Sequence, residues 1–87
     1  MSRYRVEVLP AALRSLRKVD PSVARRLQGA IALLSEDPRP PSSKALVARP
    51  GRFRVRVGDY RIIYSIQHDV LLVLVIALGH RREIYDR

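Results

Sequence analysis

The segment RFRVRVGDYRIIYSIQ, residues 52–67, decides how this chain folds. Before Gly58 and Asp59, apolar residues alternate with arginines, and after them tyrosines and isoleucines recur at every second position. Side chains two residues apart lie on the same face of a strand, and Gly-Asp is a common two-residue hairpin connection. The segment therefore predicts two antiparallel strands joined at Gly58–Asp59, with an apolar face and a cationic face.

If Gly58 and Asp59 form the loop, the register of the hairpin follows. Counted outward from the loop, the cross-strand pairs are Val57–Tyr60, Arg56–Arg61, Val55–Ile62 and Arg54–Ile63. Like charges placed directly opposite each other destabilise a sheet by roughly 0.2–1 kcal/mol, so the Arg56–Arg61 pair does not serve the hairpin's stability. A phosphate held between them, with Arg54 two residues along, would remove that cost through bidentate guanidinium contacts. The alternative is a solvated basic face.

The composition favours a polyanionic partner. The chain has 87 residues, which is one small domain spanning residues 1–87, and a net charge of +9 from fifteen arginines and two lysines against eight acidic residues. The bias towards arginine suits phosphate and base contacts. Nucleic acid is the leading partner class, although an anionic membrane surface or an acidic protein would also attract this charge.

The absence of cysteine rules out a disulfide framework and a thiolate metal site, and indicates a reducing, cytoplasmic location. The longest apolar run, residues 70–78, has nine residues, whereas a membrane span needs about twenty. The first ten residues have no signal-peptide pattern. The two histidines are far apart and there is no carboxylate cluster, so no metal site is predicted. The sequence also lacks a glycine-rich phosphate loop, so no cofactor is predicted.

The remaining elements are predicted from the periodicity of apolar residues and from the residues that begin or end helices and strands. Alternation over residues 4–9 predicts a first strand that stops at Pro10, and helical spacing predicts a short helix over residues 12–19. Asp20–Pro21 is a typical helix start, and the second helix ends before the proline-rich segment of residues 37–43. Residues 44–50 are expected to form an irregular approach to the hairpin. After a tight turn at His68–Asp69, residues 70–77 predict a strand that Gly79 breaks.

The predicted order is βααβββ, an α+β domain in which two helices pack on one face of a mostly antiparallel, twisted sheet. In the last strand, simple alternation places Leu71, Val73 and Val75 on the core face. The same alternation places Leu72, Leu74 and Ile76 on the face of Arg61, so this strand is expected to be central or covered by a partner. If the charged tail folds beside the hairpin, it surrounds the arginine face.

With these elements in place, the chain resembles the RelE/ParE toxin superfamily of bacterial toxin–antitoxin systems, and within it the RelE ribonucleases. The segments that carry the resemblance are residues 4–9 leading into two helices, RFRVRVGDYRIIYSI (52–66), VLLVLVIALG (70–79) and HRREIY (80–85). Together they cover nearly the whole chain. The segment DYRIIY, followed by an apolar strand and a terminal basic-x-x-Tyr pattern, is specific to the superfamily, whereas the division between RelE and ParE activity depends on fewer residues.

The resemblance implies a metal-independent endoribonuclease that cuts messenger RNA in the ribosomal A site by attack of a ribose 2′-OH on the adjacent phosphate. It implies that Arg54 and Arg56 orient the 2′-OH, Arg61 holds the scissile phosphate and Arg81 serves the leaving group. Tyr85 is implied to stack on or orient a base, or else to anchor the C-terminal segment in the core. The implied partners are the 70S ribosome, messenger RNA and a RelB-like antitoxin.

One departure from the family pattern concerns the proton acceptor. The best-known members have lysines where this chain has Arg54 and Arg56, and a guanidinium group is almost never deprotonated. His80 is the candidate for that role, because an imidazole ordinarily titrates near pH 6.5. The alternative is a histidine at a strand end with no chemical role.

Two rival functions stay open at this point. A ParE-like toxin has the same fold but inhibits DNA gyrase without cutting RNA, and a basic RNA-binding module would have no toxicity. Gyrase-dependent DNA breaks on expression would favour the first rival. An effect of Tyr85 on messenger cleavage would favour the ribonuclease.

Overall fold

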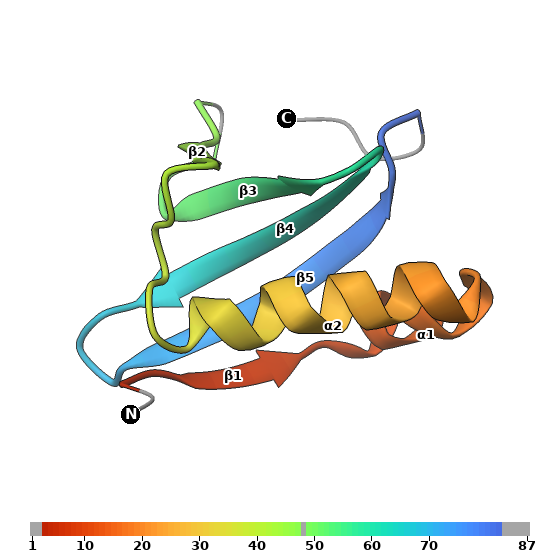
Figure 1. Ribbon diagram of the computed structural model, residues 1–87. Helices are drawn as coiled ribbons and strands as arrows, with labels where there is room; N and C mark the ends of the chain where they lie inside the picture. Colours follow the sequence, from red (N-terminus) through yellow and green to blue (C-terminus); the bar gives the residue numbers. More distant parts are fainter. Residues whose placement is uncertain (1–2, 48, 83–87) are drawn as a thin grey trace.

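The computed structural model describes residues 3–47 and 49–82. Its elements, in chain order, are β1 (Arg5–Val8), α1 (Pro10–Lys18), α2 (Pro21–Leu34), β2 (Ser43–Ala45), β3 (Arg52–Val57), β4 (Tyr60–Gln67) and β5 (Leu72–His80). The five strands form one sheet in the order β1-β5-β4-β3-β2 (Figure 1). The pair β1–β5 is parallel and the other three pairs are antiparallel. The predicted α+β class and mostly antiparallel sheet are confirmed.

The hairpin of β3 and β4 has the predicted register. Val57 pairs with Tyr60, and Arg56 lies directly opposite Arg61. Gly58 has a φ angle of +60°, a conformation that favours glycine. A Cβ atom at Gly58 would also lie 3.0 Å from a guanidinium nitrogen of Arg26 on α2. The turn therefore favours glycine for its backbone angle, whereas the Arg26 guanidinium is the end of a flexible side chain and could shift to admit a Cβ atom.

Three expectations about the strands are wrong. The approach to the hairpin contains β2, a three-residue edge strand that pairs Lys44 with Arg54. Strand β5 begins at Leu72, after a four-residue turn, and it continues through Gly79 to His80. Gly79 does not break the strand, because it pairs with Arg61 of β4; a glycine weakens a strand without ending it when the ladder continues on the neighbouring chain segment.

A β-bulge in β5 changes which side chains face the core. The partner of Ile63 is Ala77, but the partner of Tyr64 is Val75, so Ile76 is skipped. An extra residue in one strand shifts all later side chains to the opposite face. Leu78 and His80 therefore lie on the same face as Val75, whereas an uninterrupted alternation would place them on the face of Arg61.

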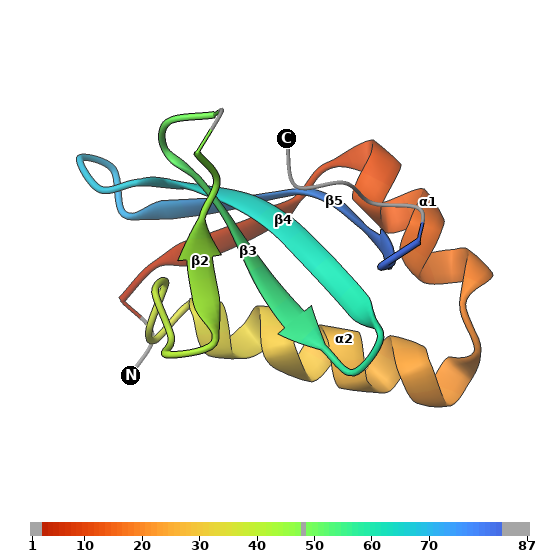
Figure 2. The same ribbon diagram turned by 90° about the horizontal axis from the view of Figure 1, so that it is seen from above.

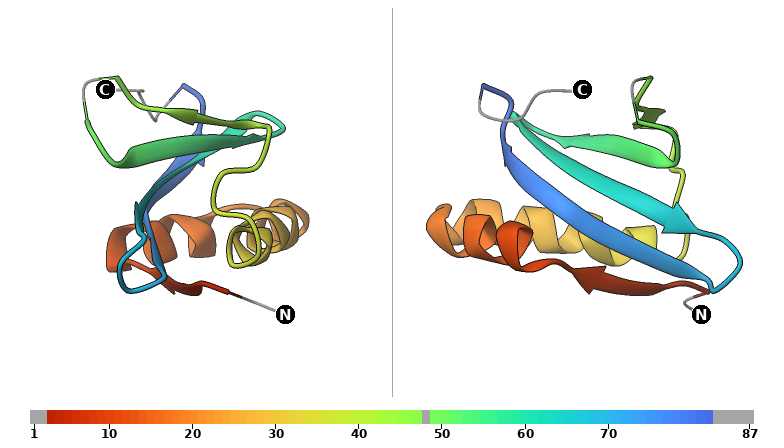
Figure 3. Two further views of the ribbon diagram at one scale, coloured as in Figure 1. Left: turned by 90° about the vertical axis from the view of Figure 1, so that its left-hand side faces the viewer. Right: turned by 180° about the vertical axis from the view of Figure 1, so that it is seen from behind.

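Both helices lie on one side of the strongly twisted sheet (Figures 2 and 3). Apolar side chains of α1 and α2 pack there against alternate residues of the strands. The buried cluster comprises Ala12, Leu16, Leu27, Ile31, Leu34, Val55, Ile62, Tyr64, Val73, Val75 and Leu78. Helix α2 begins as predicted, because the Asp20 carboxylate accepts a hydrogen bond from the Ser22 backbone N–H at 3.1 Å. The hydrogen bond from the Ser22 hydroxyl, followed by that backbone contact, lowers the pKa of Asp20.

The proline-rich segment is fixed to the sheet through one buried tyrosine. The Tyr64 hydroxyl donates a hydrogen bond to the Pro38 carbonyl at 2.7 Å, and its ring stacks on Phe53 with centroids 5.9 Å apart. The Arg39 guanidinium lies 5.0 Å from the centre of the Phe53 ring, within cation–π range. Burial raises the pKa of the Tyr64 phenol. The side chain is fully buried, as expected of a core residue.

No helix in the described ranges is long and apolar enough to cross a membrane.

Candidate functional site

The face of the sheet away from the helices carries a row of cations on the two strands of the hairpin. Arg52, Arg54 and Arg56 alternate with the core-facing residues of β3, and Arg61 lies opposite Arg56 on β4. Lys44 of β2 pairs with Arg54 and so shares its face. We call these five residues, Lys44, Arg52, Arg54, Arg56 and Arg61, the cationic row. Three adjacent strands contribute to it, and each strand is held by its neighbours' backbone hydrogen bonds.

The Arg56–Arg61 pair is the centre of the row. Directly opposed residues of an antiparallel pair have Cα atoms about 4.5–5.5 Å apart, which brings the two guanidinium groups within reach of a single anion. Arg56 is exposed and Arg61 is half-buried, with its Nε atom fully covered. The residue paired with Arg61 on its other side is Gly79, which adds no side chain to this face. The arrangement presents two forked donors beside a short stretch of bare backbone.

Arg81 lies just beyond β5, at the same end of the sheet as the hairpin loop. Its backbone N–H donates to the Asp59 carbonyl at 2.8 Å, and its Nε atom lies 3.9 Å from the Asp59 carboxylate. The two side chains are 49% and 64% exposed, so the ion pair is a surface contact. Asp59 adjoins the Tyr60–Arg61 step of β4. The fold therefore brings Arg81 to the end of the sheet where the Arg56–Arg61 pair lies.

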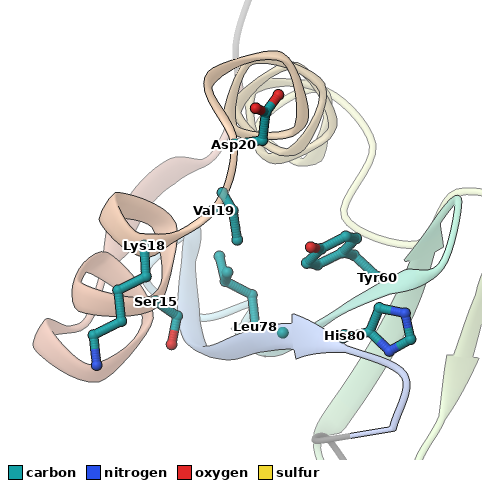
Figure 4. A pocket seen from close by; sticks show the side chains of 8 residues that line it. Ser15, Lys18, Val19, Asp20, Tyr60, Leu78 and His80 are labelled. Carbon is teal, nitrogen blue, oxygen red and sulfur yellow. The ribbon is translucent and has the colours of Figure 1, made fainter.

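His80 is not brought to the cationic row. Because of the bulge at Ile76, it pairs with Tyr60 on the helix-covered face, with the two rings edge to face and 5.5 Å apart. It lines a cavity of about 530 Å³ between the α1–α2 junction and the ends of β4 and β5 (Figure 4). The other lining residues are Ser15, Lys18, Val19, Asp20, Tyr60, Leu78 and Gly79. The sheet separates the His80 ring from the arginine side chains.

Tyr85 lies outside the described residues, so its position relative to the row stays a prediction. The catalytic roles expected of Arg54, Arg56, Arg61, Arg81 and His80 also stay predictions. Sequence reasoning missed Lys44 as a member of the row. A three-residue strand has too few positions for an alternation to appear, and only the cross-strand register assigns Lys44 to a face.

Among residues 3–47 and 49–82, no three His, Asp or Glu side chains are close enough together to hold a metal ion. The positive charge available to an anion on the open face comes from guanidinium and ammonium groups. Such groups bind phosphate through charge-assisted hydrogen bonds, and arginine does so with two parallel donors. The site is suited to hold a phosphodiester and to stabilise extra negative charge on it.

Comparison with known proteins gives a consistent family assignment. Residues 6–85 match the family model described as the ParE toxin of the type II toxin–antitoxin system parDE. Toxin RelG of Mycobacterium tuberculosis is 31% identical over 85 residues, which are 97% of this chain and 98% of that toxin. A putative RelE-like toxin protein of Escherichia coli is 24% identical over 80 residues, covering 91% of this chain and 84% of the relative.

Solved structures give the same answer for the fold. The toxin–antitoxin complex RelBE2 of Mycobacterium tuberculosis superposes with a TM-score of 0.80 at 29% identity, covering 91% of this chain and 99% of the toxin chain. The archaeal RelE–RelB complex of Pyrococcus horikoshii has a TM-score of 0.82 at 24% identity and covers 94% and 99% of the two chains. The chain therefore belongs to the RelE/ParE superfamily and is a RelE-family toxin of a type II toxin–antitoxin system.

Proposed function

We propose that this toxin is a ribosome-dependent endoribonuclease that cuts messenger RNA in the ribosomal A site. The observation that carries the proposal is the cross-strand Arg56–Arg61 pair on the open face, with Arg54 beside it. Two directly opposed arginines destabilise a sheet, and an anion that binds between them would offset that cost. In the bound state that anion is the scissile phosphate of the messenger.

The reaction is a transesterification within the RNA. The 2′-oxygen loses its proton to solvent as it attacks the adjacent phosphorus, a 2′,3′-cyclic phosphate forms, and the bond to the 5′-oxygen of the next nucleotide breaks as that oxygen takes up a proton from solvent. Arg61 holds the phosphate, while Arg54 and Arg56 orient the 2′-OH and stabilise the charge that develops on the phosphorane. Arg81, at the end of the same face, serves the departing 5′-oxygen. Tyr85 stacks on or orients a base.

The arginines of the cationic row do not supply a proton acceptor. The arginines act through charge and position, since a guanidinium does not release its proton near neutral pH. Of the five cations in the row, only Lys44 carries an amine, and it is next to Arg54. A site that relies mainly on charge stabilisation still gains two to three orders of magnitude from each well-placed donor. In this proposal the toxin supplies charge stabilisation, and the ribosome positions the messenger for attack.

The partners follow from the same proposal. The two solved structures named above are the toxin–antitoxin complex RelBE2 and a RelE–RelB complex, and we propose that a RelB-like antitoxin neutralises this toxin. An antitoxin segment rich in acidic residues would complement the net charge of +9 and the cationic row. The substrate is messenger RNA on the 70S ribosome, which places the activity in the cytoplasm.

The direct test adds purified toxin to ribosomes programmed with a defined messenger and, in parallel, to the same messenger alone, and maps the new 5′ ends. We expect cuts confined to the A-site codon and none on free messenger. The double variant Arg56→Ala/Arg61→Ala should lose cutting. Arg14→Ala/Arg17→Ala on α1 is the matched control, because both doubles lower the net charge from +9 to +7 (9 − 2 = 7).

Both doubles are compared at saturating toxin, so that differences in ribosome affinity do not enter. Equal loss in the two doubles would mean that charge alone matters, and would remove the Arg56–Arg61 pair as the site. Absence of any cut by the wild-type toxin would contradict the proposal. Gyrase-dependent DNA breaks under those conditions would assign the toxin the ParE-like activity.

A further inference from the structure

The position of His80 defines the state of its ring. Its Nδ1 atom lies 3.2 Å from the backbone nitrogen of Arg82. A backbone N–H can only donate, so Nδ1 is the acceptor and the proton of the neutral imidazole is on Nε2. An acceptor on one side chain for the N–H two residues later is the geometry of an Asx turn, which asparagine and aspartate usually supply. Here an imidazole closes that turn.

The turn that His80 closes is the one that carries Arg81. On one side the Arg81 N–H is bound to the Asp59 carbonyl at 2.8 Å, and on the other side the Arg82 N–H is bound to His80. The ion pair of Arg81 with Asp59 is half exposed, and pairs of that kind contribute little to the position of a side chain. These backbone hydrogen bonds therefore set the position from which the Arg81 side chain extends.

The His80 ring is itself held in place by the core. It packs edge to face against Tyr60, with an interplanar angle of 77°, and the Tyr60 ring packs against the buried cluster. The titratable and charged groups around His80 are Tyr60 on β4, Lys18 and Asp20 across the cavity, and Arg81 and Arg82 in the turn. A series of contacts thus connects the core, through Tyr60 and His80, to the turn that carries Arg81.

We infer that His80 is a positioning residue for Arg81 and does not accept the proton of the 2′-OH. The inference rests on the proposed function, in which Arg81 serves the leaving oxygen. Nδ1 accepts the hydrogen bond of the Arg82 N–H, so the ring is engaged in holding the turn that carries Arg81.

Two substitutions separate positioning from proton transfer. In His80→Asn the amide oxygen can replace Nδ1 as the acceptor, but it cannot take up a proton. His80→Ala has neither property. In single-turnover cutting on programmed ribosomes, we expect His80→Asn to stay within about threefold of wild type. His80→Ala should lose up to about tenfold, the effect of one hydrogen bond. His68→Ala, at the opposite end of the sheet, is the control and should match wild type.

A second readout needs no ribosome: amide hydrogen exchange at Arg82, measured by NMR, should be as slow in His80→Asn as in wild type and faster in His80→Ala. If wild type cuts nothing, the proposed function fails, and the exchange rates still decide whether His80 closes the turn.

Two results would overturn the inference. A loss of about a hundredfold or more in both variants would show that His80 transfers a proton, since general bases contribute on that scale. Cutting and exchange rates equal to wild type in both variants would show that the turn does not depend on His80.

Discussion

The residues on the two faces of the sheet differ in what they contribute to the protein: those on one face contribute to stability, and those on the other form the candidate site. On the helix-covered face, alternate residues of β3 and β4 such as Val55 and Ile62 are buried and contribute to stability through removal of apolar surface from water. On the open face, the intervening residues of β3 are arginines, and one of them lies directly opposite Arg61 of β4. The same hairpin therefore carries the core on one face and the candidate site on the other. Substitutions on the two faces should affect different measurements.

The largest effect is expected from Arg61→Ala. Cutting on programmed ribosomes should fall by about a thousandfold, roughly 4 kcal/mol of transition-state stabilisation, because a preorganised donor to the phosphorane is lost. The midpoint temperature of thermal unfolding should stay close to that of wild type or rise, since an opposed pair of like charges is removed. Arg61→Lys keeps the charge but loses the bidentate fork, so it should recover only part of the activity. A full recovery by lysine would show that only charge matters at this position.

The mirror experiment is Leu27→Ala in the core. Leu27 is fully buried between α2 and the sheet, and truncation should lower the free energy of unfolding by about 3 kcal/mol through lost transfer energy and a residual cavity. Chemical denaturation measures this change. At a temperature where the variant is folded, its single-turnover cutting should match wild type. A large loss of cutting in a fully folded variant would break the separation of the two faces.

Tyr64→Phe tests the link between the core and the proline-rich segment. The variant leaves the Pro38 carbonyl without its donor and should lower the free energy of unfolding by about 1–2 kcal/mol. Because burial raises the pKa of Tyr64, the wild-type contribution is complete below the ordinary value of 10.0 and is lost as the pH rises through the raised value. The stability difference between wild type and Tyr64→Phe should therefore narrow above about pH 10. Denaturation at neutral and alkaline pH measures it, and a constant difference would contradict the assignment.

The smallest effect is expected at the edge of the row. Lys44→Ala should reduce cutting by up to about fivefold, because an exposed charge of this kind contributes up to about 1 kcal/mol. Arg14→Ala, which removes one exposed charge from α1, is the control in the same ribosome assay. A loss of a hundredfold at Lys44 would instead assign its amine to proton transfer.

The sequence was informative where local rules suffice. The alternation about Gly58–Asp59 fixed the register to the residue, and Asp20–Pro21 marked the start of α2. Prediction from the sequence failed where one extra residue in a strand changes which face the later side chains occupy. The bulge at Ile76 leaves no composition signal, yet it moves His80 from the face of Arg61 to the face of Tyr60. Likewise, β2 is a strand only because β3 offers it an edge. The candidate arginines could therefore be predicted, but the place of the histidine could not.

The parallel pairing of β1 with β5 has a consequence for the synthesis of the protein. Strand β5 lies between β1 and β4, so the last described strand to be translated is the one that joins the first strand to the hairpin. Until it is available, β1 has no strand to pair with and cannot join the hairpin, and such long-range contacts form late and slowly. A nascent chain that ends before Leu72 cannot assemble the sheet that supports the arginines. The toxin should therefore become active only after β5, Leu72–His80, has been translated.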